Sequence, residues 1–388
     1  MKHKNIWIVV DHPNQIINAI GLSIYLKKFK SVNLLISKHK YWSNSSILFI
    51  KQFFNSTYIF PKIEFSKNFI NEYFKFFIIR QKLKKISVNK KDIFLVLSDN
   101  VILEVVLIKF FTKNIRYKLL NKSTNEKFKS VLKSSYAKEK LISIIWKFMF
   151  FKLFNLKVLM YYQDKNDPKM FAVVFENNIS ELFNKVLCFN DNILEKFDVN
   201  EIPSLLPYVG KKIYSIHKKQ EEKIIFFGSS LHRHNLYQIK FTNKCLRYIE
   251  KYFPNAKYFY KPHPHDKVEH KFISLGRFKL YNGLESTEIL MINGKNDFTH
   301  YFSISSTSIL TIINMGYVNA YVFFPLYKDY SKDFLKIIQR AYEPIKTKKA
   351  IFIDSFKIAP LKYVSVYNSK SMSKQLKHLN KKLLTADN

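Results

Sequence analysis

The chain has 388 residues, of which 47% are hydrophobic and 16% aromatic, enough to bury two ordinary cores and too many for a disordered protein. Its two cysteines, Cys188 and Cys245, show neither a disulfide framework nor a metal-ligand spacing, which favours a reducing compartment such as the cytosol. The 65 lysines and arginines exceed the 29 acids and give a net charge of +36, but they are spread along the chain without a nucleic-acid motif, which argues against nucleic acid as the partner.

The first half of the chain alternates predicted strands and helices. Apolar runs and helical periodicity predict, in chain order, a strand at Ile6–Val10, a helix at Gln15–Lys28, a strand at Val32–Ser37, a helix at Ser45–Phe54 and a strand at Asp92–Ser98. This alternation predicts a mostly parallel sheet with helices on both faces.

No segment of the sequence predicts a membrane span. The run Ile6–Val10 is too short for the apolar region of a signal peptide, so we expect the chain to remain inside the cell. The longer apolar stretch Leu141–Tyr162 is interrupted by Lys147, Lys152 and Lys157, which disfavour a spanning helix. We expect that stretch to be a core or interfacial helix, with contact to lipid as the alternative.

A connection between two domains is predicted at Phe197–Ile216. This segment contains Pro203, Pro207 and Gly210, follows the strand-like Lys185–Phe189 and shows no sustained periodicity. We therefore expect two domains, residues 1–210 and 211–388. A C-terminal tail that crosses back to the first domain is an alternative.

A second alternating series follows the connection. In chain order, the predicted elements are a strand at Lys223–Gly228, a helix at Gln238–Tyr252, a strand at Ala256–Tyr260, a helix at Ser286–Asn293, a strand at Tyr301–Ile304, a helix at Ser306–Met315 and a strand at Asn319–Phe324. The expected fold class is α/β, with two Rossmann-like domains facing one another across a cleft.

The second half contains a pattern suited to holding a phosphate. In Pro262-His263-Pro264 the prolines restrict the backbone on both sides of an imidazole. Ser305, Ser306 and Thr307 open a predicted helix, where hydroxyl and backbone N–H groups can bind an anion. A structural alternative stays open, because a histidine in such a turn is often only a hydrogen-bonded loop residue.

These motifs each follow a predicted strand, as ligand-binding residues do in open α/β sheets. Four segments of this half together resemble the C-terminal half of the bacterial sialyltransferases of glycosyltransferase family 52 and the related polysialyltransferases. They are Phe226-Phe227-Gly228-Ser229, Tyr260–Pro264, Glu288-Ile289-Leu290 and Ser303–Thr307. The resemblance covers roughly residues 223 to 325. It implies a GT-B fold, with an acceptor-side N-terminal domain and a C-terminal domain that binds the nucleotide sugar.

The resemblance also implies roles for individual residues. His263 and the Ser305-Ser306 hydroxyls would engage the phosphate of CMP-sialic acid, with His263 stabilising the leaving group. The remaining residues expected to bind the nucleotide are Gly228, Ser229, Lys261, Pro264, Glu288 and Thr307. Because a CMP-sugar has no diphosphate, we expect neither a metal nor another cofactor. Glu288 could equally be a helix N-terminal acid placed there for the dipole.

The first half departs from the family pattern. These sialyltransferases carry an acidic pair followed by glycine on a loop after a strand of the N-terminal domain, and the corresponding segment here is expected to be Arg116–Ser123, which has neither acid nor glycine. Asparagine and lysine cannot replace a carboxylate as base at neutral pH.

Three other carboxylates are candidates for the general base. Asp11 and Asp99 each follow a predicted strand, and Asp191 lies nearer the connection. Each could instead be a helix N-cap. Further candidates for the site are the side chains of His265, His232, His234 and Glu285.

The expected function is metal-independent, inverting transfer of sialic acid from CMP-sialic acid to a surface glycan, either a lipooligosaccharide or a capsule. Two alternatives remain: a transferase for another CMP- or CDP-activated group such as Kdo or a polyol phosphate, and a catalytically weakened glycan-binding protein. The charge favours a peripheral position on the anionic cytoplasmic face of a bacterial membrane. Codon drift in an AT-rich genome is an alternative explanation for the charge.

Overall fold

The computed structural model describes the following residues: 5–12, 15–28, 30–38, 42–62, 69–97, 107, 110, 111, 113–121, 158–163, 171–175, 185–190, 201–203, 205, 206, 209, 221–229, 236–263, 269–283, 286–292, 298–315, 319–328, 335, 338, 339, 342 and 351–360. The chain divides into two compact units, one within Met1–Ser204 and one within Leu205–Lys374. The division follows Ser204, whereas the expected boundary was at residue 210. The expected return of the C-terminal tail lies outside the described residues.

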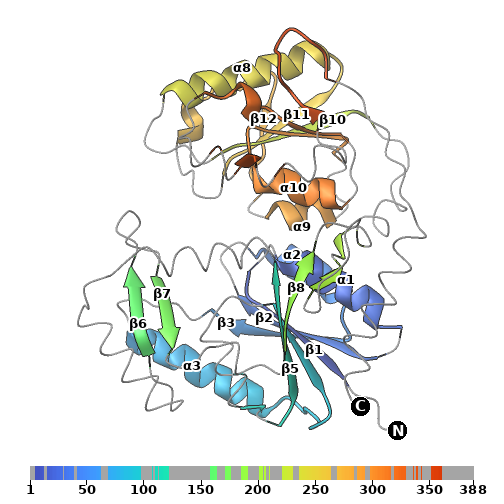
Figure 1. The fold of residues 1–388 in the computed structure, drawn as a ribbon, viewed down its shortest axis with the longest axis vertical. Coiled ribbons are helices and arrows are strands. Elements are labelled where there is room, and N and C mark those ends of the chain that lie inside the picture. Colours follow the sequence, from blue (N-terminus) through green and yellow to red (C-terminus); the bar gives the residue numbers. More distant parts are fainter. Residues whose placement is uncertain are drawn as a thin grey trace. The chain divides into compact units, whose positions relative to one another are not determined.

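The first unit is built on a seven-stranded parallel sheet (Figure 1). In spatial order its strands are β3 (Ser56–Pro61), β2 (Val32–Lys38), β1 (Ile6–Val10), β4 (Ile93–Val96), β5 (Ile115–Asn121), β8 (Lys185–Asn190) and β9 (Glu201–Pro203). The sheet grows outward in both directions from β1, because β2 and β3 lie on one side of it and β4 on the other. This is the strand order of a Rossmann-like fold.

Local sequence explains the central elements of this unit. All five residues of β1 are buried, as expected for a continuous apolar run in a parallel sheet covered on both faces. Helix α1 (Ile16–Leu26) is buried at ten of its eleven positions. Helix α2 (Asn44–Lys51) begins after Ser43, whose hydroxyl accepts a hydrogen bond of 3.1 Å from the Ser46 N–H. Helix α3 (Phe69–Lys84) contacts the edge strand β3.

A buried carboxylate holds the amino end of the first sheet. Asp92 is fully buried and accepts hydrogen bonds from the backbone N–H of Asn5 at 2.9 Å, the indole N–H of Trp7 at 3.0 Å and the backbone N–H of Asn89 at 3.0 Å. These bonds tie β1 to the segment before β4. Asp92 therefore has a structural role at the edge opposite to the one at which ligands bind in such sheets.

The second unit repeats this topology. Its parallel strands lie in the order β12 (Lys279–Leu280), β11 (Lys257–Lys261), β10 (Lys223–Phe227), β13 (His300–Ser303), β14 (Ala320–Val322) and β15 (Ile351–Phe352). Numbered within the unit, this is the order 3-2-1-4-5-6 of the Rossmann fold. Two 3-10 turns, at Glu269–Phe272 and Phe324–Leu326, belong to the connections.

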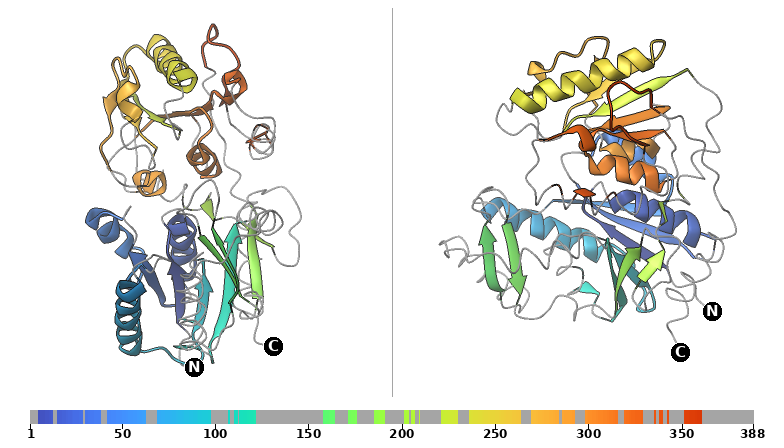
Figure 2. Two further views of the ribbon diagram at one scale, coloured as in Figure 1. Left: turned by 90° about the vertical axis from the view of Figure 1, so that its left-hand side faces the viewer. Right: turned by 45° about the horizontal axis from the view of Figure 1, so that its top comes forward.

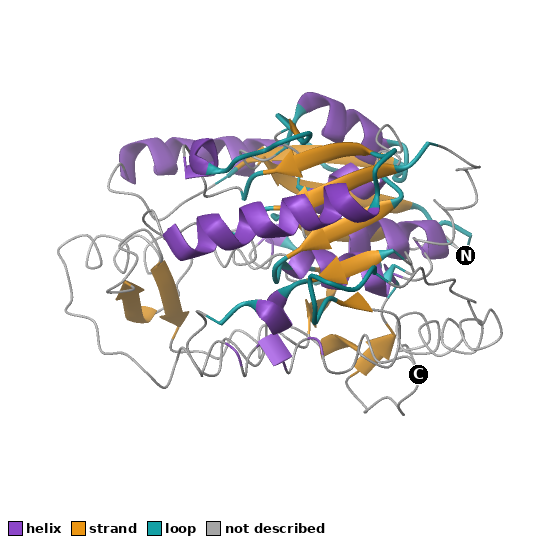
Figure 3. Ribbon diagram, turned by 90° about the horizontal axis from the view of Figure 1, so that it is seen from above, coloured by secondary structure: helices purple, strands orange, loops and turns teal. Residues whose placement is uncertain are grey.

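Helices cover both faces of the second sheet. The long helix α8 (Leu236–Tyr252) lies along one face, and α9 (Thr287–Ile292) and α10 (Thr307–Asn314) lie on the other (Figures 1 and 2). In Figure 3, α8 is seen running across the strands beneath it. Alternate strand residues therefore face opposite helical layers, as the pleat of a strand requires.

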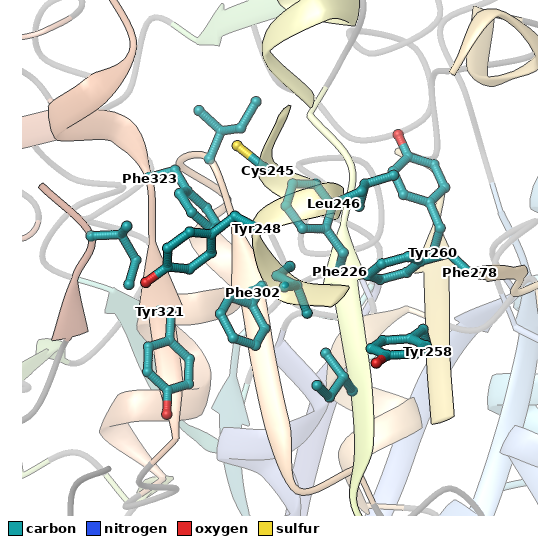
Figure 4. Close-up of a cluster of buried hydrophobic side chains, with 14 of the residues drawn as sticks. Phe226, Cys245, Leu246, Tyr248, Tyr258, Tyr260, Phe278, Phe302, Tyr321 and Phe323 are labelled. Atoms are coloured by element: carbon teal, nitrogen blue, oxygen red, sulfur yellow. The ribbon is translucent and has the colours of Figure 1, made fainter. Parts of the chain in front are cut away.

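The layer under α8 is largely aromatic (Figure 4). Four aromatic residues pair in register across neighbouring strands: Tyr260 of β11, Phe226 of β10, Phe302 of β13 and Tyr321 of β14. The Phe226 and Tyr260 rings stack with centroids 5.9 Å apart, and those of Phe302 and Tyr321 at 4.4 Å. Such rings bury large areas and prefer defined stacking geometries, which gives the sheet a rigid base.

Two expectations about the first half are wrong. The segment Arg116–Asn121, expected on a loop, lies within β5 in the interior of the sheet, with Lys118 buried. It therefore does not correspond to a loop that could carry an acidic pair. Residues 158–162, expected to end a helix, belong to β6 (Val158–Gln163), which pairs antiparallel with β7 (Phe171–Phe175). In the part of the chain that is described, no helix is long and apolar enough to cross a bilayer.

Candidate functional site

The carboxyl ends of three neighbouring strands of the second sheet lie level with one another. Phe227, the last residue of β10, pairs with Lys261 of β11 on one side and with Ser303 of β13 on the other. The strand order reverses between β10 and β13, the place where open α/β sheets bind ligands. Three connections leave the sheet at this edge: Gly228-Ser229, Pro262-His263 and Ile304–Ser306. We take this edge of the sheet as the candidate site.

Gly228 begins the connection after β10, and its backbone N–H donates to the Lys261 carbonyl at 2.8 Å. A Cβ atom at this position would meet the Tyr260 hydroxyl, so the packing of Tyr260 is enough to require glycine here. The neighbouring Ser229 Oγ is buried and has no hydrogen-bond partner among the described residues. A hydroxyl desolvated in this way is costly unless a ligand or water completes its hydrogen bonding.

The end of β11 contributes a buried cation. Lys261 is 7% exposed, donates from Nζ to the Gly283 carbonyl at 3.0 Å and lies over the Tyr281 ring at 5.4 Å. An ammonium group carries a positive charge and three hydrogen-bond donors, which suit an anionic ligand. Pro262 and His263 follow directly and are partly buried. The strand therefore delivers a cation and an imidazole to the same edge.

The turn between β13 and α10 is held by serine side chains. The buried Ser303 Oγ accepts from the Ser306 N–H at 2.9 Å, and the Ser306 Oγ accepts from the Ser308 N–H at 3.2 Å. Ser306 is therefore the N-cap of α10. Its hydroxyl proton is not used by that bond, so capping and anion binding are compatible. Ser305, just before it, is partly buried.

Two hydrogen bonds donated by residues outside the expected site support this turn. The Tyr342 hydroxyl donates to the Ser306 carbonyl at 2.8 Å, and the Ser308 hydroxyl donates to Thr287 Oγ1 at 3.0 Å, which links α10 to α9. Neither pair has a local sequence signal, because the partners are 36 and 21 residues apart. The turn is thus rigid before any ligand binds, as an anion site benefits from being.

In the first unit, Asp11 follows β1 at the corresponding edge. It is 8% exposed, and the backbone N–H groups of Asp11 and His12 both donate to Gln15 Oε1 at 3.2 Å. The Gln15 side chain thus closes the turn that carries Asp11, while His12 is exposed. Among the described residues that directly follow strands of this sheet, Asp11 is the one carboxylate. It also lies at the reversal of strand order, between β1 and β4.

Several expected site residues lie wholly or partly outside the described residues. Glu288 lies in α9, whereas its side chain, like that of Thr307 in α10, is outside the description. The remaining candidates outside the described residues are Pro264, Asp99, Asp191, His265, His232, His234 and Glu285. Within the described ranges, no three histidine, cysteine or acidic side chains gather closely enough to hold a metal ion.

Comparison with protein-family models found no match, and comparison with curated proteins found none at the sequence level. Solved structures are similar in fold. A putative UDP-N-acetylglucosamine 2-epimerase from Listeria monocytogenes has a TM-score of 0.50 at 10% identity and covers 100% of this chain and 98% of its own. Another UDP-N-acetylglucosamine 2-epimerase has a TM-score of 0.50 at 12% identity, covering 100% and 98%.

The GT-B domain of a sialyltransferase from Photobacterium damselae has a TM-score of 0.45 at 12% identity, covering 90% of this chain and 99% of its own. At these identities the likeness concerns the fold alone. Two parallel sheets, each with Rossmann strand order and helices, confirm the expected α/β class of GT-B type.

Proposed function

We propose that this protein is a glycosyltransferase whose second unit binds CMP-sialic acid. The observation that carries the proposal is the reversal of strand order between β10 and β13, where Gly228-Ser229 and Ser303–Ser306 leave the sheet on either side and Pro262-His263 leaves the next strand. A buried serine hydroxyl without a described partner, a buried lysine and the N-terminus of α10 are all donors suited to an anionic group.

These hydrogen-bond donors are suited to binding a single phosphate group. In inverting transfer, an acceptor hydroxyl attacks the anomeric carbon of the sugar while the bond between that carbon and the phosphate oxygen breaks. CMP then leaves as a phosphate monoester dianion. His263, when protonated, donates a hydrogen bond to this developing charge, and the Ser305 and Ser306 hydroxyls add two more donors. Such stabilisation needs no metal ion.

The acceptor hydroxyl must also lose its proton. Asp11 is our first candidate for the base because it is a carboxylate at the carboxyl end of β1. Asp99 remains a second candidate on sequence grounds. The acceptor we propose is a bacterial surface glycan, a lipooligosaccharide or a capsule.

The alternatives differ in what supports them. The absence of an acid from Arg116–Ser123 favours a binding protein only if this segment is the expected loop, and most of it is strand β5. A transferase for another CMP- or CDP-linked group would use the same phosphate donors. The two neighbours of equal TM-score carry the name of an enzyme for a UDP-sugar, so UDP belongs among the nucleotides to be tested.

The test is calorimetric titration with CMP, CDP, UDP and GDP. We expect CMP to bind, and His263→Ala to weaken it by about 1.5–3 kcal/mol through the loss of a charge-assisted hydrogen bond. His12→Ala, which removes an exposed histidine from the other unit, is the control and should leave CMP affinity unchanged. Unchanged affinity in His263→Ala would make that residue structural, and preference for UDP or GDP would contradict the proposed donor.

A second variant separates phosphate from base recognition. Ser305→Ala/Ser306→Ala should weaken CMP while affecting cytidine much less, because cytidine lacks the phosphate. Equal losses for the two ligands would contradict a phosphate role for this turn.

A further inference from the structure

Helix α3 carries large apolar side chains on its outer side. Four of these side chains are exposed: Ile70 (60%), Phe74 (63%), Phe77 (52%) and Ile78 (45%). Their spacing of i, i+4, i+7 and i+8 places them along one side of the helix. We call these four residues the α3 stripe. The other exposed large hydrophobic residues of the described chain are distributed over several elements: Leu48, Leu236, Tyr237, Phe272 and Ile358.

The α3 stripe is not the face that joins the helix to its unit. Ile79 and Leu83, on the opposite side of α3, are buried, and the helix contacts the edge strand β3. Lys82 adds a hydrogen bond of 2.8 Å from its Nζ to the Ile59 carbonyl. Figure 2 shows α3 along the margin of the first sheet. The helix therefore has two apolar sides, of which packing uses one.

Positive charge borders the α3 stripe. Arg80, Lys84 and Lys85 are exposed at its C-terminal end. From Ile70 to Lys91 the sequence has seven lysines and arginines and one acid, Glu72. An exposed apolar ridge with a basic border has the composition of helices that lie in the interface of anionic membranes. Isolated exposed apolar residues need no such explanation, but four on one helical face do.

We propose that the α3 stripe, with Arg80, Lys84 and Lys85, docks this protein on an anionic lipid surface. The stripe runs along a convex helix, a shape that a fluid bilayer accommodates by letting side chains enter between headgroups. The charge of +36 is spread over the whole chain, which suits an extended anionic surface better than a local acidic site on another protein. The inference does not depend on the proposed nucleotide site.

The primary experiment is co-sedimentation of the full chain with vesicles of phosphatidylglycerol and phosphatidylcholine, and with vesicles of phosphatidylcholine alone. We expect binding to the anionic vesicles that weakens as salt rises, because exposed charges are screened beyond about 8 Å at physiological ionic strength. Phe74→Ser/Phe77→Ser should lower the affinity about 10- to 100-fold. The matched control, Phe272→Ser/Ile358→Ser, removes two comparably exposed apolar side chains from the second unit and should bind as the unmodified protein does.

A charge-matched pair tests the basic border. Lys84→Glu/Lys85→Glu should lower the affinity about tenfold or more, since each basic residue near the surface contributes to binding. Lys240→Glu/Arg247→Glu makes the same change in net charge on exposed positions of α8 and should have a much smaller effect. Equal losses in the two variants would mean that total charge alone matters and would overturn the assignment to α3.

Direct contact with lipid is measured by placing a fluorophore in the stripe. Phe77→Trp should add emission that brominated lipids quench, whereas Phe272→Trp should add emission that they do not quench. Three outcomes would each overturn the proposal. These are absence of vesicle binding at low salt, unquenched emission from Phe77→Trp, and full vesicle binding by Phe74→Ser/Phe77→Ser. A dimer that dissociates in Phe74→Ser/Phe77→Ser, without vesicle binding by the unmodified protein, would assign the stripe to a second copy instead.

Discussion

Gly228 and Tyr260 are in such close contact that a Cβ atom added to Gly228 would lie 2.5 Å from the Tyr260 hydroxyl oxygen and 3.0 Å from Cζ of the same ring. Tyr260 belongs to the aromatic row beneath α8, whereas Gly228 begins the connection at the candidate nucleotide site. The packing of the core thus fixes the backbone at the carboxyl end of β10. Core and site are coupled at this one pair of residues.

Gly228→Ala should destabilise the protein by about 1–3 kcal/mol, because a methyl group must displace a ring that is packed on all sides. Tyr260→Phe in the same chain should recover part of this loss, since it removes the nearest atom. Urea denaturation of the two single variants and the double variant measures the coupling as a double-mutant cycle. Additive losses would show that the contact does not determine the residue at position 228.

Ser306 allows its two roles to be separated. Because glycine is a nearly adequate N-cap, Ser306→Gly should cost only a few tenths of a kcal/mol in stability while removing a hydroxyl from the site. Ser306→Asp keeps a good cap but places a carboxylate where we expect the phosphate. We expect Ser306→Asp to retain its thermal stability and lose most CMP affinity in titration. Normal CMP affinity in both variants would leave Ser306 with the cap alone.

Two of the three candidates for the base, Asp11 and Asp99, are compared by substituting each carboxylate with its amide. Asp11→Asn or Asp99→Asn, whichever residue is the base, should lower transfer from CMP-sialic acid by about 10²–10⁴-fold and leave CMP binding intact. Donor hydrolysis should be measured in parallel, and Asp354→Asn, at an exposed position of the second unit, is the control. Full transfer by both variants would eliminate both candidates, and no transfer by the unmodified protein with any acceptor would favour a binding protein.

Two tyrosines of the second core should make the protein sensitive to alkaline pH. Burial raises the pKa of Tyr321 and of Tyr248 above the ordinary value. Unfolded tyrosine loses its proton near pH 10, while the folded residues keep theirs, so the folded state binds more protons and stability falls as pH rises above about 10. Below that pH both states are protonated and these groups contribute no pH dependence.

Tyr321→Phe tests this directly. The Tyr321 hydroxyl is buried without a hydrogen-bond partner among the described residues, so its removal should leave stability unchanged at pH 7 or raise it by about 1 kcal/mol. The variant should also lose stability less steeply above pH 10 in urea titrations. Tyr237→Phe, which removes an exposed hydroxyl, should show neither effect. A loss of more than 1 kcal/mol at pH 7 would reveal a hydrogen bond to the Tyr321 hydroxyl.

Much of the fold follows from local sequence pattern. The apolar run of β1 and the periodic pattern of α8 predicted those elements to within a few residues, because one strand buried on both faces and one amphipathic helix each leave a distinct period. The strand β5 was missed because Arg116 and Lys118 interrupt its apolar pattern. Short strands such as β12 and β15 carry too few residues for any pattern.

The candidate site divides in the same way. The sequence alone identifies Pro262-His263 and Ser305-Ser306 as residue types that can bind an anion. Their position after strands follows from the predicted alternation of strands and helices. Their alignment with Gly228 at one edge required the sheet, since it depends on the pairing of Phe227 with both Lys261 and Ser303. The support of Ser306 by Tyr342 also required the tertiary structure, because these residues are 36 positions apart.

By itself, then, the sequence determined the alternation of strands and helices, the two α/β units, the excess of positive charge and the residue types that can bind a phosphate. Tertiary structure decided the order of the strands, which connections leave the sheet together, and which side of α3 is exposed. The physical reason is that period and residue type are properties of a single element, whereas burial is a property of the pair of surfaces that meet. Both sides of α3 are apolar, so only its packing against β3 could show which of them was left facing outward.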